Sequence, residues 1–256
     1  MGLGFFPHQR VRPVQKDVLE NIQRGLSQGK HLIIHAPTGI GKTAAVLAPA
    51  LEHALSKHLR LLFLTSRHTQ HKIVIDTLRK IKGKCDANFN VVDLIGKRWM
   101  CSQKGAQKLH PAEFFEYCKT MREHQMCSYY SNLKLKGKLV EVAIRLATEV
   151  RQHGPLDCEA LVKRCQEIGI CPYEFTLLLA KDADVIVGDY SYVFNPTISS
   201  VFFSKLNIGF GDAIIVVDEG HNLPQRLRDI LSDSLSALTI KSALRELKSY
   251  LSLIHI

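Results

Sequence analysis

Apolar residues in this chain gather in short runs, separated by stretches in which they recur every three or four positions. Five of these runs have the length of a buried strand: residues 31–35, 60–65, 88–95, 184–189 and 213–217. Helical spacing is illustrated by Leu19, Ile22 and Leu26, which precede the first run. Short continuous apolar runs are typical of parallel strands covered on both faces. The alternation therefore predicts an α/β fold with a mainly parallel sheet flanked by helices.

The first apolar run leads into a loop with the composition of a phosphate-binding loop. Residues 36–43 read Ala-Pro-Thr-Gly-Ile-Gly-Lys-Thr and precede an apolar helical run at 44–51. Glycines allow such a loop to point backbone N–H groups at one anion, and the helix N-terminus adds positive potential. The usual pattern begins with glycine where this chain has Ala36. We predict that the residues binding nucleotide phosphates are Ala36, Pro37, Thr38, Gly39, Ile40, Gly41, Lys42 and Thr43.

Within this loop, Lys42 is placed to reach the β- and γ-phosphates, and the Thr43 hydroxyl to bind Mg²⁺. The last apolar run ends in two carboxylates, Asp218 and Glu219, followed by His221. A P-loop ATPase needs a carboxylate for Mg²⁺ at the end of the strand beside the phosphate loop, and Asp218 fits that role. Glu219 is placed to orient or deprotonate the attacking water. The motifs in this order predict hydrolysis of a nucleoside triphosphate.

Further candidates precede the phosphate loop. Arg12 and Gln15 stand at the start of the first helical stretch, where many nucleotide-driven motors carry a glutamine that contacts the base. An ordinary solvated helix start is the alternative, and the sequence does not decide between them.

Two other groups of polar and aromatic residues follow apolar runs, at the sheet edge where parallel α/β proteins bind ligands. After residues 60–65 we expect contacts to the phosphates of single-stranded nucleic acid from Ser66, Arg67, Thr69 and Gln70. Helix capping by Thr65 or Ser66 is the alternative. After residues 184–189, Tyr190 and Tyr192 are candidates for stacking on bases, with a place in the core as the alternative.

The overall charge fits a polyanionic partner. The formal net charge is +10 and the pI about 9.3, although a basic balance also serves solubility. Residues 97–172 contain 13 Lys or Arg against 8 Asp or Glu, half of the whole excess. No apolar run approaches membrane-spanning length, so we expect no membrane partner and a cytoplasmic, nucleoid-associated location.

Six of the seven cysteines lie between residues 97 and 172. Cys158 and Cys165 share one apolar helical face with Leu161, which predicts core positions, and Cys85 lies outside the segment in a polar loop. The remaining four are Cys101, Cys118, Cys127 and Cys171, separated by 16, 8 and 43 residues. An iron–sulfur cluster, tetrahedral zinc and unligated thiols all remain open, but the lack of Cys-x-x-Cys pairs favours a cluster.

Together these motifs resemble the XPD and DinG family of superfamily 2 DNA helicases, which carry an iron–sulfur cluster. Residues 97–101 and 169–175 resemble the first and last cluster-ligand contexts of that family, whereas Gly220 replaces the usual alanine of its Asp-Glu-Ala-His box. The resemblance implies a RecA-like domain interrupted by a helical insert with a [4Fe-4S] cluster. Its ligands would be Cys101, Cys118, Cys127 and Cys171.

What the family does is the second part of the expectation. The resemblance implies ATP-driven 5′-to-3′ translocation on single-stranded DNA, unwinding at a forked junction, and DNA repair as the process, by a monomer with unspecified repair or transcription-factor partners. It assigns Arg98 to DNA and makes His221 the link between the nucleotide and DNA sites. The alternative from another class is an ATP-binding, nucleic-acid-binding regulatory module with structural zinc, against which the water-activating carboxylate of Glu219 argues.

The resemblance also divides the chain. We expect residues 1–96 and 173–224 to form the first helicase domain, 97–172 the cluster insert and 225–256 the start of an arch domain. Family members continue with a second RecA-like domain that supplies an arginine finger. We therefore expect the 256 residues to be the N-terminal part of a truncated gene model, with slow hydrolysis on its own.

Overall fold

The computed structural model describes residues 4–37, 39–85, 87–135, 138–232 and 237–254. The chain divides into two units, Met1–Glu219 and Gly220–Ile256. Each unit is described by itself below.

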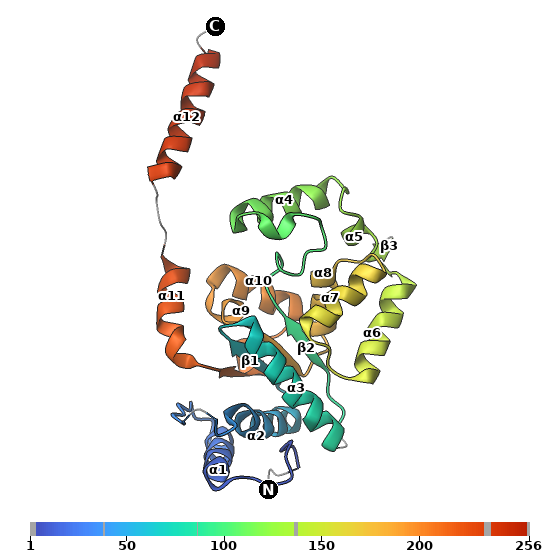
Figure 1. The fold of residues 1–256 in the computed structure, drawn as a ribbon, viewed down its shortest axis with the longest axis vertical. Coiled ribbons are helices and arrows are strands. Elements are labelled where there is room, and N and C mark those ends of the chain that lie inside the picture. The colour runs from blue at the N-terminus through green and yellow to red at the C-terminus, as the bar shows by residue number, and fades with distance from the viewer. Residues whose placement is uncertain (1–3, 38, 86, 136–137, 233–236, 255–256) are drawn as a thin grey trace. The chain divides into compact units, whose positions relative to one another are not determined.

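Four parallel strands form the central sheet of the first unit (Figure 1). Their order is β2 (Val91–Leu94), β5 (Val185–Asp189), β1 (Arg60–Thr65) and β6 (Ala213–Val217). β1 pairs with β5 on one side and β6 on the other, in parallel, so all carboxyl ends meet at one edge. The predicted α/β class and four of the five predicted strands are therefore confirmed.

The strand predicted at residues 31–35 is wrong in this structure. The segment joins no ladder, and Leu32, Ile33 and Ile34 are 40%, 102% and 41% exposed. Leu32 instead packs against Gly25, where an added Cβ would lie 2.4 Å from a Leu32 methyl. In the part of the chain that the structure describes, the outer edge of β6 has no partner strand. An apolar run indicates burial, but pairing also requires a backbone ladder partner, which composition does not specify.

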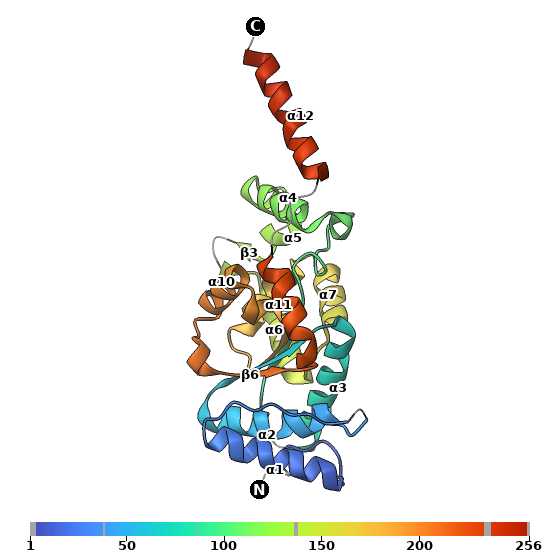
Figure 2. The same ribbon diagram turned by 90° about the vertical axis from the view of Figure 1, so that its left-hand side faces the viewer.

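Helices cover both faces of the sheet. α2 (Lys42–Lys57) and α3 (His68–Lys84) bury Leu47, Leu51 and Val74 against Phe63 of β1, and α1 (Pro13–Ser27) packs on α2. Figure 2 shows α1 and α2 on one side of the sheet and α10 (Pro196–Leu206) on the other. α10 follows the short α9 (Ser191–Phe194) and precedes the 3₁₀ turn η2 (Phe210–Asp212).

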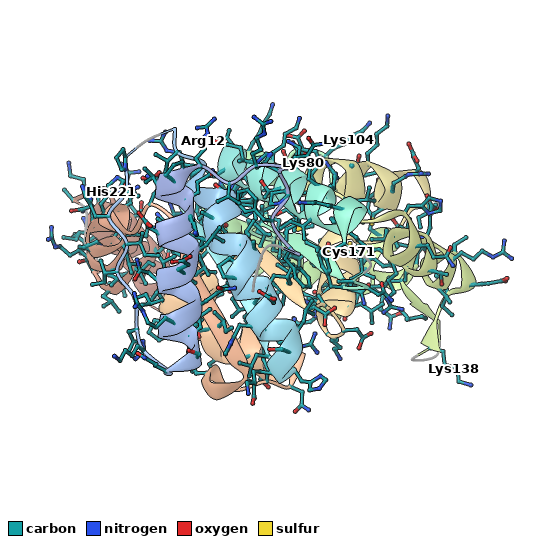
Figure 3. The ribbon with its side chains drawn as sticks, turned by 90° about the horizontal axis from the view of Figure 1, so that it is seen from below. Arg12, Lys80, Lys104, Lys138, Cys171 and His221 are labelled. Atoms are coloured by element: carbon teal, nitrogen blue, oxygen red, sulfur yellow. The ribbon has the colours of Figure 1, made fainter. Side chains whose placement is uncertain are left out.

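The segment between β2 and β5 is mainly helical, as predicted. Its elements are η1 (Ala106–Lys108), α4 (Pro111–Glu123), α5 (Ser128–Ser131), the hairpin β3 (Lys134–Leu135) and β4 (Lys138–Leu139), α6 (Glu141–His153), α7 (Cys158–Glu167) and α8 (Pro172–Ala180). The predicted core positions Cys158, Leu161 and Cys165 are all buried on α7. Exposed basic side chains such as Lys104 and Lys138 project from the segment (Figure 3). The insert boundaries at 97 and 172 remain predictions.

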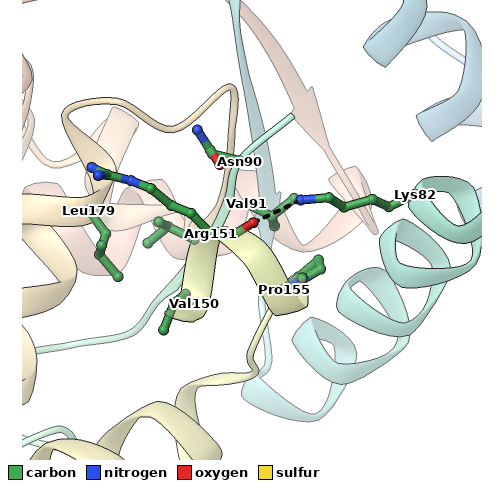
Figure 4. Close-up of a pocket in the computed structure, with 9 residues that line it drawn as sticks. Lys82, Asn90, Val91, Val150, Arg151, Pro155 and Leu179 are labelled. Carbon is green, nitrogen blue, oxygen red and sulfur yellow. Dashed lines mark hydrogen bonds between the residues drawn. The ribbon is translucent and has the colours of Figure 1, made fainter. Parts of the chain in front are cut away.

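A cavity marks the seam between this segment and the sheet (Figure 4). Asn90, Arg151 and Leu179 are among its lining residues. Lys82 Nζ crosses the seam, donating to the carbonyl oxygens of Phe89 at 3.0 Å and Arg151 at 3.4 Å. None of the predicted site residues lines this cavity, and Lys82 joins α3 to α6 beside it.

The second unit contains the turn η3 (Gly220–Asn222), α11 (Leu223–Leu231) and α12 (Ala237–Ile254). Ile240, Leu244 and Leu247 on α12 are exposed. The division after Glu219 does not test the boundary expected at residue 225, and the four-part division stays a prediction. Within the described ranges, no helix is long and apolar enough to cross a membrane.

Candidate nucleotide and metal sites

The phosphate loop has the backbone that its glycines predict. Gly39 and Gly41 have φ of 81° and 80°, in the left-handed region that favours glycine. Gly41 is the N-cap of α2, so the loop ends at a helix N-terminus, a natural anion site. Lys42 Nζ donates to the Ala36 carbonyl at 3.2 Å, which places the amine inside the curve of the loop. Thr38 lies outside the described residues.

Arg12 and Gln15 bind the backbone of this loop. Gln15 is 4% exposed; its Oε1 accepts from Arg12 N at 2.9 Å and its Nε2 donates to the Ile40 carbonyl at 2.6 Å. Arg12, exposed at the start of α1, donates from Nη1 to the Gly39 carbonyl at 3.3 Å (Figure 3). The solvated alternative is wrong for Gln15, since its amide is buried. Base recognition by the pair stays a prediction.

The two carboxylates lie where β6 ends. Asp218 N donates to the Leu64 carbonyl at 2.9 Å, which continues the ladder with β1. Burial raises the pKa of Asp218 and the neighbouring Glu219 raises it further, whereas Lys42 lowers it. Lys42 begins α2, and α2 contacts β6, the strand that Asp218 follows. Glu219 has φ of 52°, which is uncommon for a residue with a side chain and is typical of functional sites.

His221 belongs to η3 in the second unit. Its predicted coupling role stays a prediction, because the two units are described independently.

The stacking role predicted for Tyr190 and Tyr192 is wrong in this structure, and the core alternative describes both residues. They are 1% and 5% exposed, so neither ring offers a face to a base. Tyr192 donates its hydroxyl to the Ile95 carbonyl at 2.9 Å. The Tyr190 hydroxyl bonds to the carbonyl of Asp218 and, at 3.1 Å, to that of Glu219. An aromatic residue after a strand suits either place, and only the tertiary fold decides.

The polar residues after β1 are partly accessible. Arg67 and Thr69 are exposed, whereas Ser66 and Gln70 are half-buried and lie 3.5 Å apart, Oγ to Oε1. The capping alternative is wrong, because the N-cap of α3 is Arg67 and no side chain caps the helix. Contacts to DNA from these residues and from Arg98 stay predictions.

Two histidines at the start of α3 were missed by sequence reasoning. His71 Nδ1 and Asp93 Oδ1 form a buried pair at 2.5 Å, and the other oxygen of Asp93 accepts from Cys158 N at 2.8 Å. His68 pairs with Asp189 at 3.6 Å and packs edge-on against Trp99. The sequence does contain a sign of this pair: Asp93 stands in the otherwise apolar strand β2, and a buried carboxylate requires a buried hydrogen-bond partner.

The four predicted cysteine ligands surround one cavity. Cys101, Cys118, Cys127 and Cys171 line it together with aromatic rings and the cations Lys97 and Arg122. Gln103 Nε2 lies 3.6 Å from Cys127 Sγ. None of the other three cysteines lines this cavity, as expected from the sequence.

We call this space the cysteine cavity. Its four thiols have the chemistry to bind a soft metal ion or cluster. Burial raises the pKa of Cys171 to about 11 and also raises that of Cys101, whereas Lys97 lowers both. Thiolates bind iron and zinc, and cations beside the cavity favour the thiolate form. Among the residues that the structure describes, no group of three or more His, Cys, Asp or Glu has the geometry of a formed metal site. The cluster is therefore a proposal.

The fold and the loop define a P-loop α/β domain whose strand-end carboxylates share a site with the phosphate loop. Residues 63–240 match the DEAD_2 family model, and residues 12–110 match the DEAD/DEAH box helicase model. Because the first match spans more than half of the chain, this protein belongs to the DEAD_2 family.

Similar proteins are longer than this chain. The ATP-dependent DNA helicase XPD of Sulfolobus acidocaldarius is 29% identical over 246 residues, covering 94% of this chain and 38% of the relative. The XPD/RAD3 helicase subunit of the general transcription and DNA repair factor IIH of Saccharomyces cerevisiae is 22% identical, covering 94% and 32%. The chain thus spans about a third of these curated relatives.

Solved structures confirm the fold. An XPD helicase structure aligns with a TM-score of 0.62 at 23% identity, covering 93% of this chain and 37% of the other. A structure described as truncated XPD aligns with a TM-score of 0.54 at 24% identity, covering 91% and 59%.

The close approach of α1 to the phosphate loop gives a first prediction. Gly39→Ala and Gly41→Ala both place a side chain at positive φ, which costs roughly 1–2 kcal/mol. At Gly41 the new Cβ would also lie 2.6 Å from Gln15 Nε2, whereas at Gly39 nothing lies within 4 Å. We expect Gly41→Ala to lower the free energy of unfolding in urea more than Gly39→Ala. The same two glycine substitutions made in a Gln15→Ala variant should lower the free energy of unfolding equally. Equal losses when Gln15 is present would contradict the predicted clash between the new side chain at position 41 and Gln15.

The second prediction concerns His68. Its pairing with Asp189 raises the pKa of His68 above the ordinary 6.5, although partial burial opposes the shift. The stabilisation is therefore present below pH 6.5 and is lost as the pH rises through the raised pKa. We expect Asp189→Asn to move the pKa toward 6.5 in an NMR titration of the histidine ring. Asp182→Asn, which alters an exposed carboxylate paired with Arg151, serves as the control; a shift of equal size there would refute the pairing.

Proposed function

We propose that this chain is the N-terminal part of an ATP-dependent DNA helicase that moves 5′ to 3′ along single-stranded DNA and unwinds forked duplexes. One observation carries the proposal: a phosphate loop with two glycines at positive φ leads into the N-terminus of α2, and the carboxylates Asp218 and Glu219 follow strand β6 of the same parallel sheet unit. Family membership and relatives named as DNA helicases support it. The printed name of the yeast relative, a transcription and DNA repair factor subunit, supports repair as the process.

The nucleotide site would work by positioning and electrostatics. Backbone N–H groups of residues 36–43 and the N-terminus of α2 bind the phosphates, and Lys42 neutralises charge on the β- and γ-phosphate oxygens. Thr43 and Asp218 are the residues placed to hold Mg²⁺, which when bound screens the charge that develops on those oxygens. Glu219 orients the attacking water and accepts its proton.

The DNA path would follow the same sheet edge. Ser66, Arg67, Thr69 and Gln70 follow β1, and the exposed members can contact phosphates. Arg98 and the basic surface of residues 97–172 extend the path, and His221 couples it to the nucleotide. We propose that the protein acts as a monomer and that residues 1–96 and 173–224 form one motor domain around the insert, with an arch beginning at residue 225.

We also propose that Cys101, Cys118, Cys127 and Cys171 hold a [4Fe-4S] cluster. The lining of the cysteine cavity supports this, because four thiols face one space beside Lys97 and Arg122. Lys97 is held at 3.2 Å and Arg122 at 3.6 Å from the same carboxylate oxygen of Glu174. Such fixed cations favour an anionic cluster, and the cluster would join the helices that carry its ligands.

The hydrolytic mechanism is tested by two substitutions that separate binding from chemistry. We expect Lys42→Ala to weaken binding of a fluorescent ATP analogue, because the phosphates lose their cation. Glu219→Gln should keep that affinity and lower the rate of phosphate release, measured with single-stranded DNA, by roughly 10²–10⁴. Hydrolysis by Glu219→Gln at the wild-type rate would exclude this carboxylate as the base.

The cluster is tested by metal content after anaerobic purification. We expect a brown protein that contains iron, and we expect Cys127→Ser to lose both the visible absorption band and the iron. Cys85→Ser is the matched control, since Cys85 is a half-buried thiol that bonds to the Ile81 carbonyl away from the cavity. Zinc without a visible band in the wild type would refute the cluster, and would favour the zinc-stabilised regulatory module if DNA-stimulated hydrolysis were also absent.

A further inference from the structure

The Tyr190 hydroxyl lies where β5 and β6 end. Tyr190 directly follows β5 and is 1% exposed. Its O–H is shared between the carbonyl oxygens of Asp218 and Glu219, the residues that follow β6. The backbone N–H of Asp218 in turn donates to the Leu64 carbonyl of β1 at 2.9 Å. One buried phenol therefore links the end of β5 to the residues that follow β6.

The bonded carbonyls belong to a backbone conformation that requires support. Glu219 has φ of 52°, and residues with a side chain keep such a conformation only where the surrounding structure holds them there. Binding two consecutive carbonyl oxygens to one hydroxyl fixes both peptide planes, and hence the direction in which each Cβ leaves the chain. Asp218 Oδ1 adds a local bond by accepting from Glu219 N at 3.1 Å.

The phenol is well suited to this task. Its ring is buried edge-on against Phe194, so the hydroxyl has little freedom to move. Burial raises the pKa of Tyr190, and the nearby carboxylates of Asp218 and Glu219 raise it further, which keeps the hydroxyl protonated as a donor.

We propose that Tyr190 is a positioning residue for ATP hydrolysis, which holds the Asp218–Glu219 backbone so that both carboxylates face the nucleotide. This inference rests on the proposed function. It adds a physical link between the end of β5 and the residues that act on the γ-phosphate. Tyr190 makes no contact with nucleotide in this role and exchanges no proton.

The test compares two conservative variants. Tyr190→Phe removes only the shared hydroxyl, whereas Tyr192→Phe removes an equally buried hydroxyl that bonds to the Ile95 carbonyl, away from the carboxylates. We expect Tyr190→Phe to lower kcat for ATP roughly 3- to 10-fold, the effect of one hydrogen bond, with KM unchanged. Hydrogen–deuterium exchange of a peptide covering residues 213–219 should become faster. Tyr192→Phe should match the wild type in both measurements.

The outcomes separate this inference from the proposed function. Wild-type kcat and exchange in Tyr190→Phe, or equal changes in both variants, would overturn the positioning role. A rise in KM with unchanged kcat would also overturn it, because the hydroxyl would then act on binding. If the wild-type chain neither binds the fluorescent ATP analogue nor hydrolyses ATP, the proposed function fails, and the positioning of the 213–219 backbone is then decided by the exchange measurement alone.

Discussion

The parallel pairing of β1 with both β5 and β6 is the constraint on which the sites depend. The register sets Thr65 opposite Asp189 and Leu64 opposite Val217, so the three strands end at the same level of the sheet. Ligand contacts in open α/β sheets gather at this edge, where strands end and loops begin. A slip of one residue in a strand would move each of its side chains to the opposite face of the sheet. The Tyr190 ring would then leave its buried site, and its hydroxyl would lose both carbonyls of the carboxylate pair.

The phosphate loop is held by a different kind of contact. Its carbonyl groups are bound by Arg12 and Gln15, which precede it by more than twenty residues. A buried amide must satisfy its polar atoms, and Gln15 does so by accepting from Arg12 N and by donating to the Ile40 carbonyl. The packing of α1 on α2 thereby sets the loop conformation, while Gly41 permits the approach that a side chain would block. The anion site therefore depends on the first helix as well as on the glycine pattern.

Local pattern predicted the elements well and their long-range partners poorly. Periodicity predicted the strand ends at 65, 189 and 217 and the apolar face of α7. This is because the spacing of apolar residues along the sequence reflects which side chains are buried. The segment at 31–35 had the same apolar signal but lacks a paired strand, since pairing depends on a neighbour in space. Likewise, Tyr190 was assigned to nucleic-acid bases by its type and position, but it is buried and its hydroxyl bonds to backbone carbonyls that only the fold brings within reach. Gln15 also bonds to a distant carbonyl, that of Ile40, which the sequence did not predict.

The buried pair of His71 and Asp93 explains how the helical segment is tied to the ligand edge of the sheet. Asp93 lies on β2 and binds the imidazole with one oxygen and the backbone of α7, through Cys158 N, with the other. Removing one partner of a buried hydrogen bond leaves the other polar group unsatisfied, at a cost of roughly 1–3 kcal/mol. α3, β2 and α7 therefore hold one another in place, and His68 on the same turn of α3 reaches both Asp189 and Trp99. A change in the segment that displaces α7 would therefore also displace the start of α3, beside the residues assigned to DNA.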